Sequence, residues 1–413
     1  MMDDLRLAWK NLWRNHTRTA ISSTAICLGF AGLLATLGIA DATYQQILVA
    51  AVKTAGGSVL VHAEGWQQSR AGDLLLVEAA RVADTARRLP GVRAVIPRMI
   101  IQGLLGSPHG AESVQLTGLD PKAQAELFDL SPFTAKGTFL GPGEERPLVV
   151  GPKLARKLAL RLGDRAVLTA TDSRGEMVRA LFRVSGILEP RAGLEEGVAF
   201  TSLGAAAAAV GAGEARTELG LVLADDARRH EIAAALSAAA GGSQRLEVVT
   251  WDQALPELLG AIRANKSVSW IFGMVVFVVM GFGIANTFLM SVLERVRELG
   301  LLSALGMTPG RTARLILAET ALLTAFSVAL GYGLGLGVHF YLSRWGLDLG
   351  AVSTMKFEVS GVMIGDLRLR SAIDPVRWGL GGVGVVVIVV LSACYPALRA
   401  ARLDPVQAMR TYE

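Results

Sequence analysis

The feature that most constrains this sequence is a set of long runs without any Asp, Glu, Lys or Arg. Four of these runs contain about 20 residues or more: Thr19–Ala40, Ser267–Leu293, Thr320–Ser343 and Trp378–Leu398. A helix rises about 1.5 Å per residue, so about 20 apolar residues cross the roughly 30 Å hydrocarbon core of a bilayer. The sequence therefore predicts four transmembrane helices.

The composition agrees with a membrane protein. Hydrophobic residues make up 52% of the 413 residues and charged residues 19%, whereas soluble chains carry about 25% charged residues. The net charge of +5 is too small and too dispersed for a nucleic-acid surface. The two cysteines, Cys27 and Cys394, lie in apolar runs near opposite ends of the chain and do not form a disulfide framework or a CxxC pair. The five histidines are scattered without an HExxH pattern, so no metal site is predicted.

The runs predict a membrane α-helical fold with a large extracytoplasmic α+β domain inserted between helices 1 and 2. The first run is longer than the roughly 7–15-residue core of a signal peptide, so we expect a permanent anchor. The predicted segments are a cytoplasmic-side amphipathic interfacial helix at 1–18, transmembrane helices at 19–41, 266–293, 319–343 and 378–398, an extracytoplasmic α+β domain at 42–265, a cytoplasmic coupling helix and turn at 294–318, a short extracytoplasmic loop at 344–377 and a cytoplasmic tail at 399–413.

The distribution of Lys and Arg predicts cytoplasmic N- and C-termini. Eleven of these residues flank the inner ends of the predicted spans and eight flank the outer ends, a modest bias in the direction of the positive-inside rule. Ahead of the first span, an apolar stripe that includes Trp9 and Trp13 faces away from a basic stripe that includes Arg14. This pattern is typical of a helix in the membrane interface; a basic tail without fixed geometry is the alternative.

The insert has the alternating pattern of a folded α+β domain, and nothing in it indicates catalysis. Ser107, His109 and Asp120 lack a GxSxG motif and lie among turn formers, so we interpret them as loop residues. The stretch 197–213 is interpreted as strand, turn and soluble helix. Other strands are predicted at 58–62, 92–101, 113–117, 148–150, 165–170, 180–187 and 220–223, and helices at 77–89, 152–160, 227–239 and 251–262.

The chain lacks the phosphate-binding motif GxxxxGK[ST]. Only Lys53 and Lys266 precede Ser or Thr, and Val52 and Asn265 stand before them in place of glycine. The sequence therefore predicts a chain that is not an enzyme and carries no cofactor, with any ATP hydrolysed by a partner. The uncharged spans also lack the ionisable relay of secondary transporters, and His339 is interpreted as an interfacial or packing residue.

The segment after the second span changes from charged to apolar and then to a turn. Leu299, Leu302 and Leu305 form a short apolar stripe, which Gly306-Met307-Thr308-Pro309-Gly310 interrupts. We expect a short helix on the inner face of the membrane, a tight turn and a returning helix that starts near Arg311. An apolar helix in this position suits docking into a groove of a partner; a simple linker is the alternative.

Residues 294–307 resemble the E-R-x-x-E-h-G-h-h-x-A-h-G-M signature of the FtsX/MacB/LolC-LolE family of ABC-transporter permeases, the mechanotransmission class. Residues 395–410 are similar to the family ending P-A-x-x-A-A-x-x-x-P-x-x-A-h-R, and 8–15 resemble its N-terminal helix. In the insert, short motifs at 118–121, 149–151 and 160–164 follow the order of the family. The resemblance covers nearly the whole chain.

The resemblance implies a dimer of permeases, identical or related, with two cytoplasmic ABC ATPase subunits that hold ATP and Mg²⁺. It implies that polar contacts to the ATPase are made by Glu294, Arg295, Arg297 and Glu298 and that the apolar anchor is formed by Leu299, Leu302 and Leu305. Gly306 and Met307 complete the expected interface. Gly331 and Gly335, in a run with Gly333 and Gly337, are expected to allow close packing of the third span, most simply against the fourth.

The implied function is ATP-driven extraction or export of a lipoprotein, lipid or other amphiphile at the outer leaflet of a bacterial inner membrane. The layout is closest to the lipoprotein-releasing permeases, but 171–176 reads as a tight hairpin turn where their receptor-binding member has a long loop. Delivery to a periplasmic acceptor protein is therefore open. A non-transporting permease that activates an extracytoplasmic hydrolase shares the same motifs and is the alternative; a membrane-anchored enzyme lacks a catalytic constellation.

Overall fold

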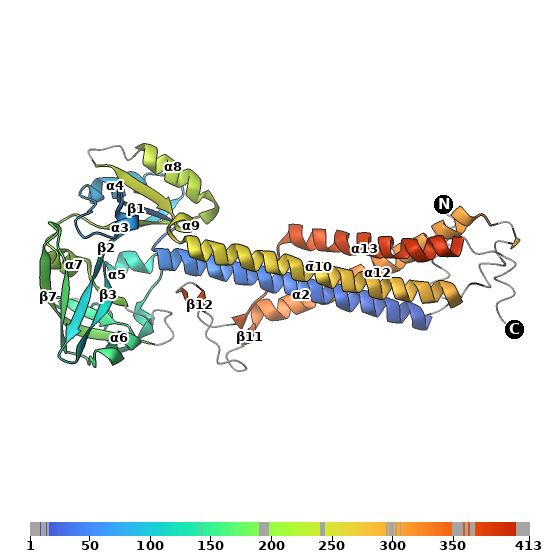
Figure 1. Ribbon diagram of the computed structural model, residues 1–413, viewed down its shortest axis with the longest axis horizontal. Coiled ribbons are helices and arrows are strands. Elements are labelled where there is room, and N and C mark those ends of the chain that lie inside the picture. Colours follow the sequence, from blue (N-terminus) through green and yellow to red (C-terminus); the bar gives the residue numbers. More distant parts are fainter. Residues whose placement is uncertain are drawn as a thin grey trace. The chain divides into compact units, whose positions relative to one another are not determined.

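The computed structural model describes residues 16–141, 143–189, 198–239, 244–294, 307–348 and 368–401, with shorter pieces at 9, 14, 296, 301, 304–305, 358–359 and 362–363. The chain divides into two compact units, whose elements are labelled in Figure 1. The helical unit comprises Met1–Gln45, Arg263–Ser353 and Arg368–Glu413, and the α+β unit comprises Gln46–Ile262 and Thr354–Leu367.

Four long helices account for most of the helical unit: α2 (His16–Ala55), α10 (Pro256–Glu294), α12 (Pro309–Arg344) and α13 (Pro375–Ala401). Among the described residues, three stretches are long and apolar enough to cross a membrane, namely Thr19–Ala55, Pro309–Arg344 and Pro375–Leu398. Helix α10 contains a shorter apolar stretch, Trp270–Val279. Three apolar helices therefore agree with the sequence, and the count of four spans stays a prediction.

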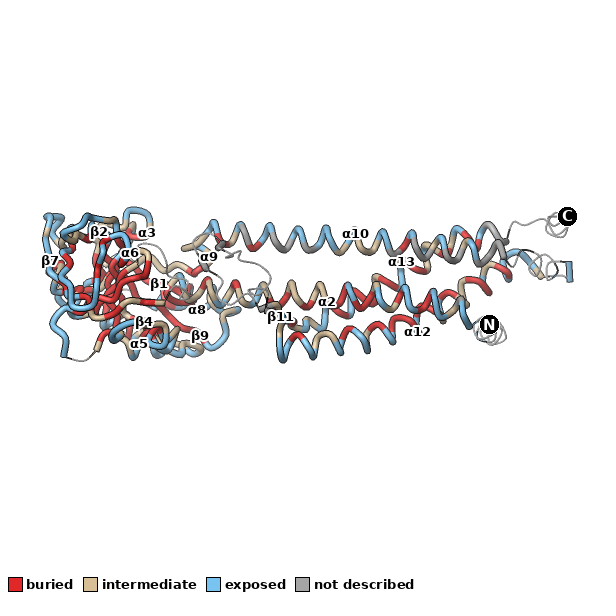
Figure 2. The backbone as a smooth tube through the Cα atoms, turned by 90° about the horizontal axis from the view of Figure 1, so that it is seen from below, coloured by how far each residue is buried: buried red, intermediate tan, exposed pale blue. Residues whose placement is uncertain are grey.

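Helices α2, α12 and α13 share a buried apolar core in the helical unit. Phe30 of α2 meets Tyr332 of α12 edge-to-face, with ring centroids 4.9 Å apart. The core is completed by Ile26, Leu33, Leu34, Leu323, Val328, Val385 and Val389. By contrast, much of the described part of α10 is exposed (Figure 2). Its exposed apolar side chains include Trp270, Met274 and Phe282. Apolar side chains on a helix surface are expected where lipid or another apolar helix surrounds the protein.

The α+β unit is built on a ten-stranded sheet of order β10-β1-β9-β2-β3-β8-β5-β7-β4, in which β6 pairs with β2 and β7. Its strands are β1 (Val59–Ala63), β2 (Val92–Ser107), β3 (Gly110–Leu119), β4 (Thr134–Gly137), β5 (Pro147–Val150), β6 (Arg165–Thr171), β7 (Met177–Leu188), β8 (Val198–Ser202), β9 (Glu218–Leu223) and β10 (Leu246–Thr250). Two-residue strands form separate pairs, β11 (Leu347–Asp348) with β14 (Arg368–Leu369) and β12 (Glu358–Val359) with β13 (Val362–Met363).

Among the described residues the sheet carries several apolar cores, and two of them are larger than the others. In the first, α4 and α8 pack on β1 and β9 through residues such as Val82, Leu236 and Leu221. In the second, α6 and α7 pack on β2, β3, β6 and β7 through residues such as Leu154 and Phe182. The helices of the unit are α3 (Trp66–Ser69), α4 (Ala79–Arg87), α5 (Pro121–Ala125), α6 (Pro152–Lys157), α7 (Leu203–Ala209), α8 (Arg229–Ala239) and α9 (Trp251–Ala254), with 3₁₀ turns at Ser131–Phe133 and Asp226–Arg228.

Some local predictions are confirmed and others are wrong. Strands β6 and β7 pair directly across 172–176, where the Asp172 carboxylate accepts hydrogen bonds from the backbone N–H groups of Arg174 and Glu176, so the predicted tight hairpin turn is confirmed. The single helix predicted at 251–262 is wrong, because the chain leaves helical geometry at Leu255 between α9 and α10. The residue before a proline is biased away from helical geometry, and Pro256 follows.

Strands β4 and β10 were not predicted from the sequence. The predicted boundary between the first span and the extracytoplasmic domain, at residue 42, falls inside α2, which continues to Ala55.

Candidate functional site

The two long helices that flank the α+β unit are attached to neighbouring strands of its sheet. Helix α2 leads through Gly56, Gly57 and Ser58 into β1, and β10 leads through α9 into α10. Strands β1 and β10 pair antiparallel, with Val59 opposite Thr250 and Ala63 opposite Leu246. The chain therefore enters this β-ladder from α2 and leaves it toward α10 at the same end of the ladder. We call this region, Gln46–Ala63 with Leu246–Ile262, the helix–sheet junction.

The helix roots also contact one another within the junction. Ile47 and Ala51 near the end of α2 form a buried apolar cluster with Trp251, Leu258 and Ile262 near the start of α10. The backbone N–H of Trp251 donates to the carbonyl of Ser58 at 3.1 Å, and this bond joins the segment between α2 and β1 to the segment between β10 and α10. A displacement of either helix root is therefore transmitted to the other and to the ladder.

Gly56 allows α2 to end directly against a buried polar cluster. Its φ is +103°, in the left-handed region that favours glycine. A Cβ added at Gly56 would collide with the guanidinium of Arg98 and would lie 2.8 Å from Glu218 Oε1. The close approach of the backbone to these two charged groups therefore requires a glycine.

The polar cluster beneath Gly56 is centred on the carboxylate of Glu218, at the start of β9. His62 Nε2 lies 2.9 Å from Glu218 Oε2, Arg98 Nη1 lies 3.6 Å from Glu218 Oε1, and Arg98 Nη2 donates to Gln124 Oε1 at 2.9 Å. Burial alone would raise the pKa of Glu218, but the hydrogen bond with His62 and the charges of Arg98 and Arg70 outweigh it and hold that pKa below its ordinary value. The cluster therefore contains a buried carboxylate that stays ionised.

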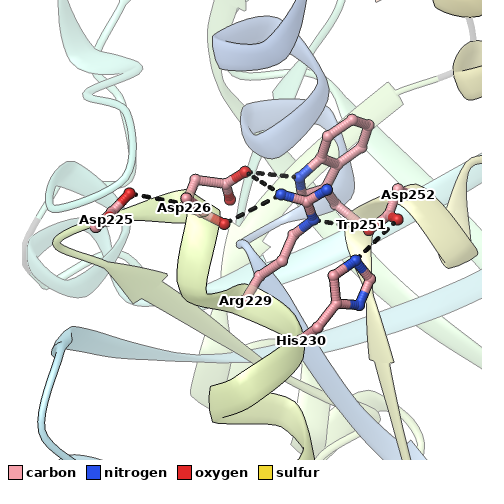
Figure 3. Close-up of polar contacts among 7 residues, drawn as sticks. Asp225, Asp226, Arg229, His230, Trp251 and Asp252 are labelled. Carbon is pink, nitrogen blue, oxygen red and sulfur yellow. Dashed lines mark hydrogen bonds and ion pairs between the residues drawn. The ribbon is translucent and has the colours of Figure 1, made fainter.

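A second polar cluster holds α9, the short helix that precedes α10, to α8 and to the 3₁₀ turn before α8 (Figure 3). Arg229 Nε bonds to Asp252 Oδ1 at 2.9 Å, and Arg229 Nη1 lies 3.2 Å from Asp226 Oδ2, which also accepts from the Trp251 indole at 3.2 Å. His230 Nε2 lies 3.4 Å from Asp252 Oδ2. Partial burial opposes ionisation of Asp252, but its hydrogen bonds and the Arg229 charge lower its pKa. The segment that leads into α10 is thus fixed to α8 by charged groups.

The residues weighed as a catalytic triad do not meet. Ser107 ends β2 and its hydroxyl donates to the carbonyl of Leu158 at 2.8 Å. Asp120 follows the far end of β3, where its carboxylate accepts from the backbone N–H of Lys122 and caps α5. The strand between them, Gly110–Leu119, separates the two by about 30 Å at roughly 3.3 Å per residue. Within the described residues, no group of His, Cys, Asp and Glu has the arrangement of a metal site.

Most residues of the predicted ATPase interface lie outside the described part of the chain. These are Arg295, Arg297, Glu298, Leu299, Leu302 and Gly306, together with the side chain of Glu294, the last residue of α10. Leu305 is 77% exposed and Met307 is half-buried. Helix α12 begins at Pro309, close to the predicted start near Arg311. The interface itself stays a prediction.

The other predicted positions have mixed outcomes. Trp9 and Arg14 are helical and exposed, while Trp13 lies outside the described residues, so the interfacial helix stays a prediction.

Gly331 and Gly335 of α12 make close approaches to α2. A Cβ added at Gly331 would lie 2.8 Å from Phe30 Cδ1, and a Cβ added at Gly335 would lie 2.8 Å from Leu34 Cδ1. The expectation that they face the fourth span is therefore wrong, because that side of α12 packs against α2.

The sequence interpretation did not single out Gly56, Glu218 or Asp252. The one available signal was the Gly56-Gly57 pair directly before a predicted strand, since paired glycines often mark a close backbone approach. The partners of Glu218 come from β1 and β2, far apart in sequence, and no local pattern connects them.

Comparison with known families decides the classification of this chain. Residues 19–239, more than half of the chain, match the family described as MacB-like periplasmic core domain. Residues 270–405 match the family described as FtsX-like permease C-terminal. The chain belongs to the FtsX/MacB/LolC family of ABC-transporter permeases. The MacB-like domain of the permease is inserted after its first apolar helix.

Relatives of the permease include proteins of two layouts. Pyoverdine export ATP-binding/permease protein PvdT of Pseudomonas entomophila is 25% identical over 432 residues, covering 99% of this chain and 60% of the relative. The permease thus spans about 60% of the length of that relative. Lipoprotein-releasing system transmembrane protein LolC of Neisseria meningitidis is 22% identical over 410 residues, covering 95% of this chain and 94% of LolC. The periplasmic region of MacB from Actinobacillus actinomycetemcomitans matches with 14% identity and a TM-score of 0.34, over 47% of this chain and 89% of that structure.

Proposed function

We propose that this chain is the permease subunit of an ABC transporter that relays ATP-driven conformational change to its extracytoplasmic domain. The relayed movement extracts or exports a lipoprotein, a lipid or another amphiphilic substrate at the outer leaflet. Family membership supports this role, and LolC, a relative that this chain matches over 94% of its length, is a lipoprotein-releasing transmembrane protein.

The observation that carries the proposal is the helix–sheet junction. Helix α2 is joined to β1 by Gly56, Gly57 and Ser58, and α10 is joined to β10 by α9 and Leu255. Strands β1 and β10 pair with one another, and the two helix roots are packed together. A relative movement of the two helices in the membrane is therefore imposed on one ladder of the sheet, because only three residues separate α2 from β1 and five separate β10 from α10.

The proposal assigns the remaining parts as follows. Helix α10 is the second of four spans, both termini are cytoplasmic, and the segment after Glu294 docks on an ABC ATPase that binds ATP and Mg²⁺. Two ATPase copies and a second permease, identical or related, complete the transporter in the bacterial inner membrane. The lack of a GxxxxGK[ST] motif supports placing ATP hydrolysis on a partner.

The proposed function is tested by ATP hydrolysis in nanodiscs that contain the permease with its co-purifying ATPase. We expect a lipoprotein or lipid extract to stimulate turnover. Stimulation by an extracytoplasmic peptidoglycan hydrolase alone would contradict transport and favour the signalling alternative, in which the domain changes shape without moving a substrate.

The coupling step has a sharper test in the junction itself. We expect insertion of Gly-Ser-Gly between Gly57 and Ser58 to abolish substrate-stimulated ATP turnover, because a flexible linker uncouples α2 from β1. ATPase association should persist, since the insertion lies in the α+β unit. The matched control is the same insertion between Arg174 and Gly175, in the exposed β6–β7 turn; stimulation that survives the junction insertion contradicts the relay.

A further inference from the structure

The α+β unit contains a groove of about 790 Å³, remote in sequence from the helix–sheet junction, lined by parts of α6, β4 and the end of β7. This volume lies within the range of roughly 300–1,000 Å³ that is typical of small-molecule sites. Ala135, Ala159 and Ile187 supply accessible apolar lining, and Ala155, Leu160 and Leu188 are buried beneath it. The groove is therefore large enough, and apolar enough, to hold a hydrocarbon chain.

Three basic side chains line the same groove: Lys136 on β4, Arg156 on α6 and Arg161 in the loop before β6. All three are exposed, and across the described residues none of them forms a hydrogen bond or ion pair through its side chain. The neighbouring Lys157, by contrast, is paired with Glu112 at 2.9 Å. The cations at the groove are available to a ligand.

One acidic residue, Asp164, also lines the groove, but its carboxylate serves the loop. Asp164 Oδ2 accepts a hydrogen bond from the backbone N–H of Arg161 at 2.7 Å. This bond uses one carboxylate oxygen of Asp164 for a backbone contact within its own turn. The groove lining therefore has three positive charges and one negative charge. A groove with apolar walls and an excess of positive charge favours an anionic headgroup, and guanidinium groups match the oxygens of phosphate or carboxylate.

We propose that this groove binds an anionic amphiphile, with its alkyl chain along Ala135, Ala159 and Ile187 and its phosphate or carboxylate held by Arg156, Arg161 and Lys136. A free phosphate would leave the apolar walls in water, and a purely apolar ligand would leave the cations unused. The site goes beyond the proposed transport function: binding requires neither ATP nor an ATPase, so its failure leaves that function intact.

The test uses the full chain in phosphatidylcholine nanodiscs and a diazirine-bearing dodecyl phosphate as photoreactive probe. After irradiation, we expect labelled peptides from 152–164 and 186–188. The double variant R156E/R161E should reduce labelling there by about tenfold or more, because charge-assisted hydrogen bonds to the headgroup are lost. The matched charge reversal Arg174→Glu, at the exposed β6–β7 turn, should leave labelling unchanged.

A second variant tests the apolar walls without changing charge. Ala135→Trp places a large side chain at an exposed position in the groove lining and should reduce labelling, while the thermal unfolding temperature stays at the wild-type value. A choline-headed probe of the same chain length should not label these peptides.

Three results would overturn the assignment. One is labelling that R156E/R161E leaves unchanged, and another is equal labelling by the choline-headed probe. The third is a competition result in which inorganic phosphate or an acidic peptide displaces the probe, whereas unlabelled dodecyl phosphate does not.

Discussion

At the scale of the residue, the junction depends on one carboxylate that is buried beside cations. The Glu218 side chain is 3% exposed, and its partners hold its pKa below the ordinary value although burial acts in the opposite direction. A carboxyl group whose pKa is lower in the folded state stabilises the fold above its unfolded pKa, about 4.3 for Glu. That contribution is lost as the pH falls through the folded pKa.

We expect Glu218→Gln to lower the stability of the α+β unit at pH 7 by roughly 3 kcal/mol, because it leaves Arg98 buried without its counter-charge. The loss should begin to shrink as the pH falls below about 4.3, where the carboxyl of the unfolded chain is protonated, and should shrink further as the pH passes through the lower pKa of the folded Glu218 carboxyl. Thermal unfolding of the full chain at pH 7 and pH 3 measures both effects. Glu176→Gln, in the exposed β6–β7 turn, is the control, and an equal loss at the two pH values would contradict this account.

At the scale of the element, the spacing of glycines on α12 decides which helix it approaches. Gly331 and Gly335 are one turn apart and meet Phe30 and Leu34 of α2, whereas Gly333 has nothing within 4 Å of an added Cβ. Small residues at this spacing allow helix backbones to approach closely in a membrane. Packing of α12 against α2 therefore requires a glycine at Gly331, whereas the position of Gly333 has room for a larger side chain.

We expect Gly331→Leu to destabilise the helical unit by roughly 1–3 kcal/mol, because the new side chain overlaps Phe30 and the backbone of Cys27. Gly333→Leu changes the same residue type on the open side of α12 and should leave stability close to wild type. The unfolding temperatures of the two variants in detergent measure the difference. Similar temperatures for both would contradict the packing of α12 on α2.

At the scale of the whole molecule, α10 joins the two regions to which function is assigned. Its first residues belong to the junction cluster with Ile47 and Ala51, and its last residue, Glu294, begins the segment expected to dock on an ATPase. The described helix is uninterrupted from Pro256 to Glu294. A helix without a break can pass a displacement along its axis, which a flexible linker cannot do.

We expect Leu302→Asp to abolish ATPase association while membrane insertion is retained, because a charge on the apolar stripe opposes burial in a partner groove. Leu301→Asp, at a neighbouring position off the stripe where the side chain is 55% exposed, should have a smaller effect. Co-purification of the ATPase with each variant measures association. Equal retention of the ATPase by both variants would remove the docking-helix interpretation.

The sequence by itself determined the properties that depend on a single segment. Long uncharged runs of about 20 residues predict apolar helices, short segments rich in Val, Leu and Ile and bounded by Gly or Pro predict most strands of the sheet, and Asp172-Ser173-Arg174-Gly175 predicts a tight turn. The break before Pro256 was also readable from local backbone sterics, although the prediction passed over it.

Only the tertiary structure decided what distant segments do together. It pairs β1 with β10, so that two helices about two hundred residues apart share one ladder. It gathers His62, Arg98 and Glu218 under Gly56, and it turns Gly331 toward α2. The residues in these contacts are far apart in the sequence, so no periodic pattern in the sequence connects them. Which faces of the helices and strands meet is decided by the packing of the whole chain.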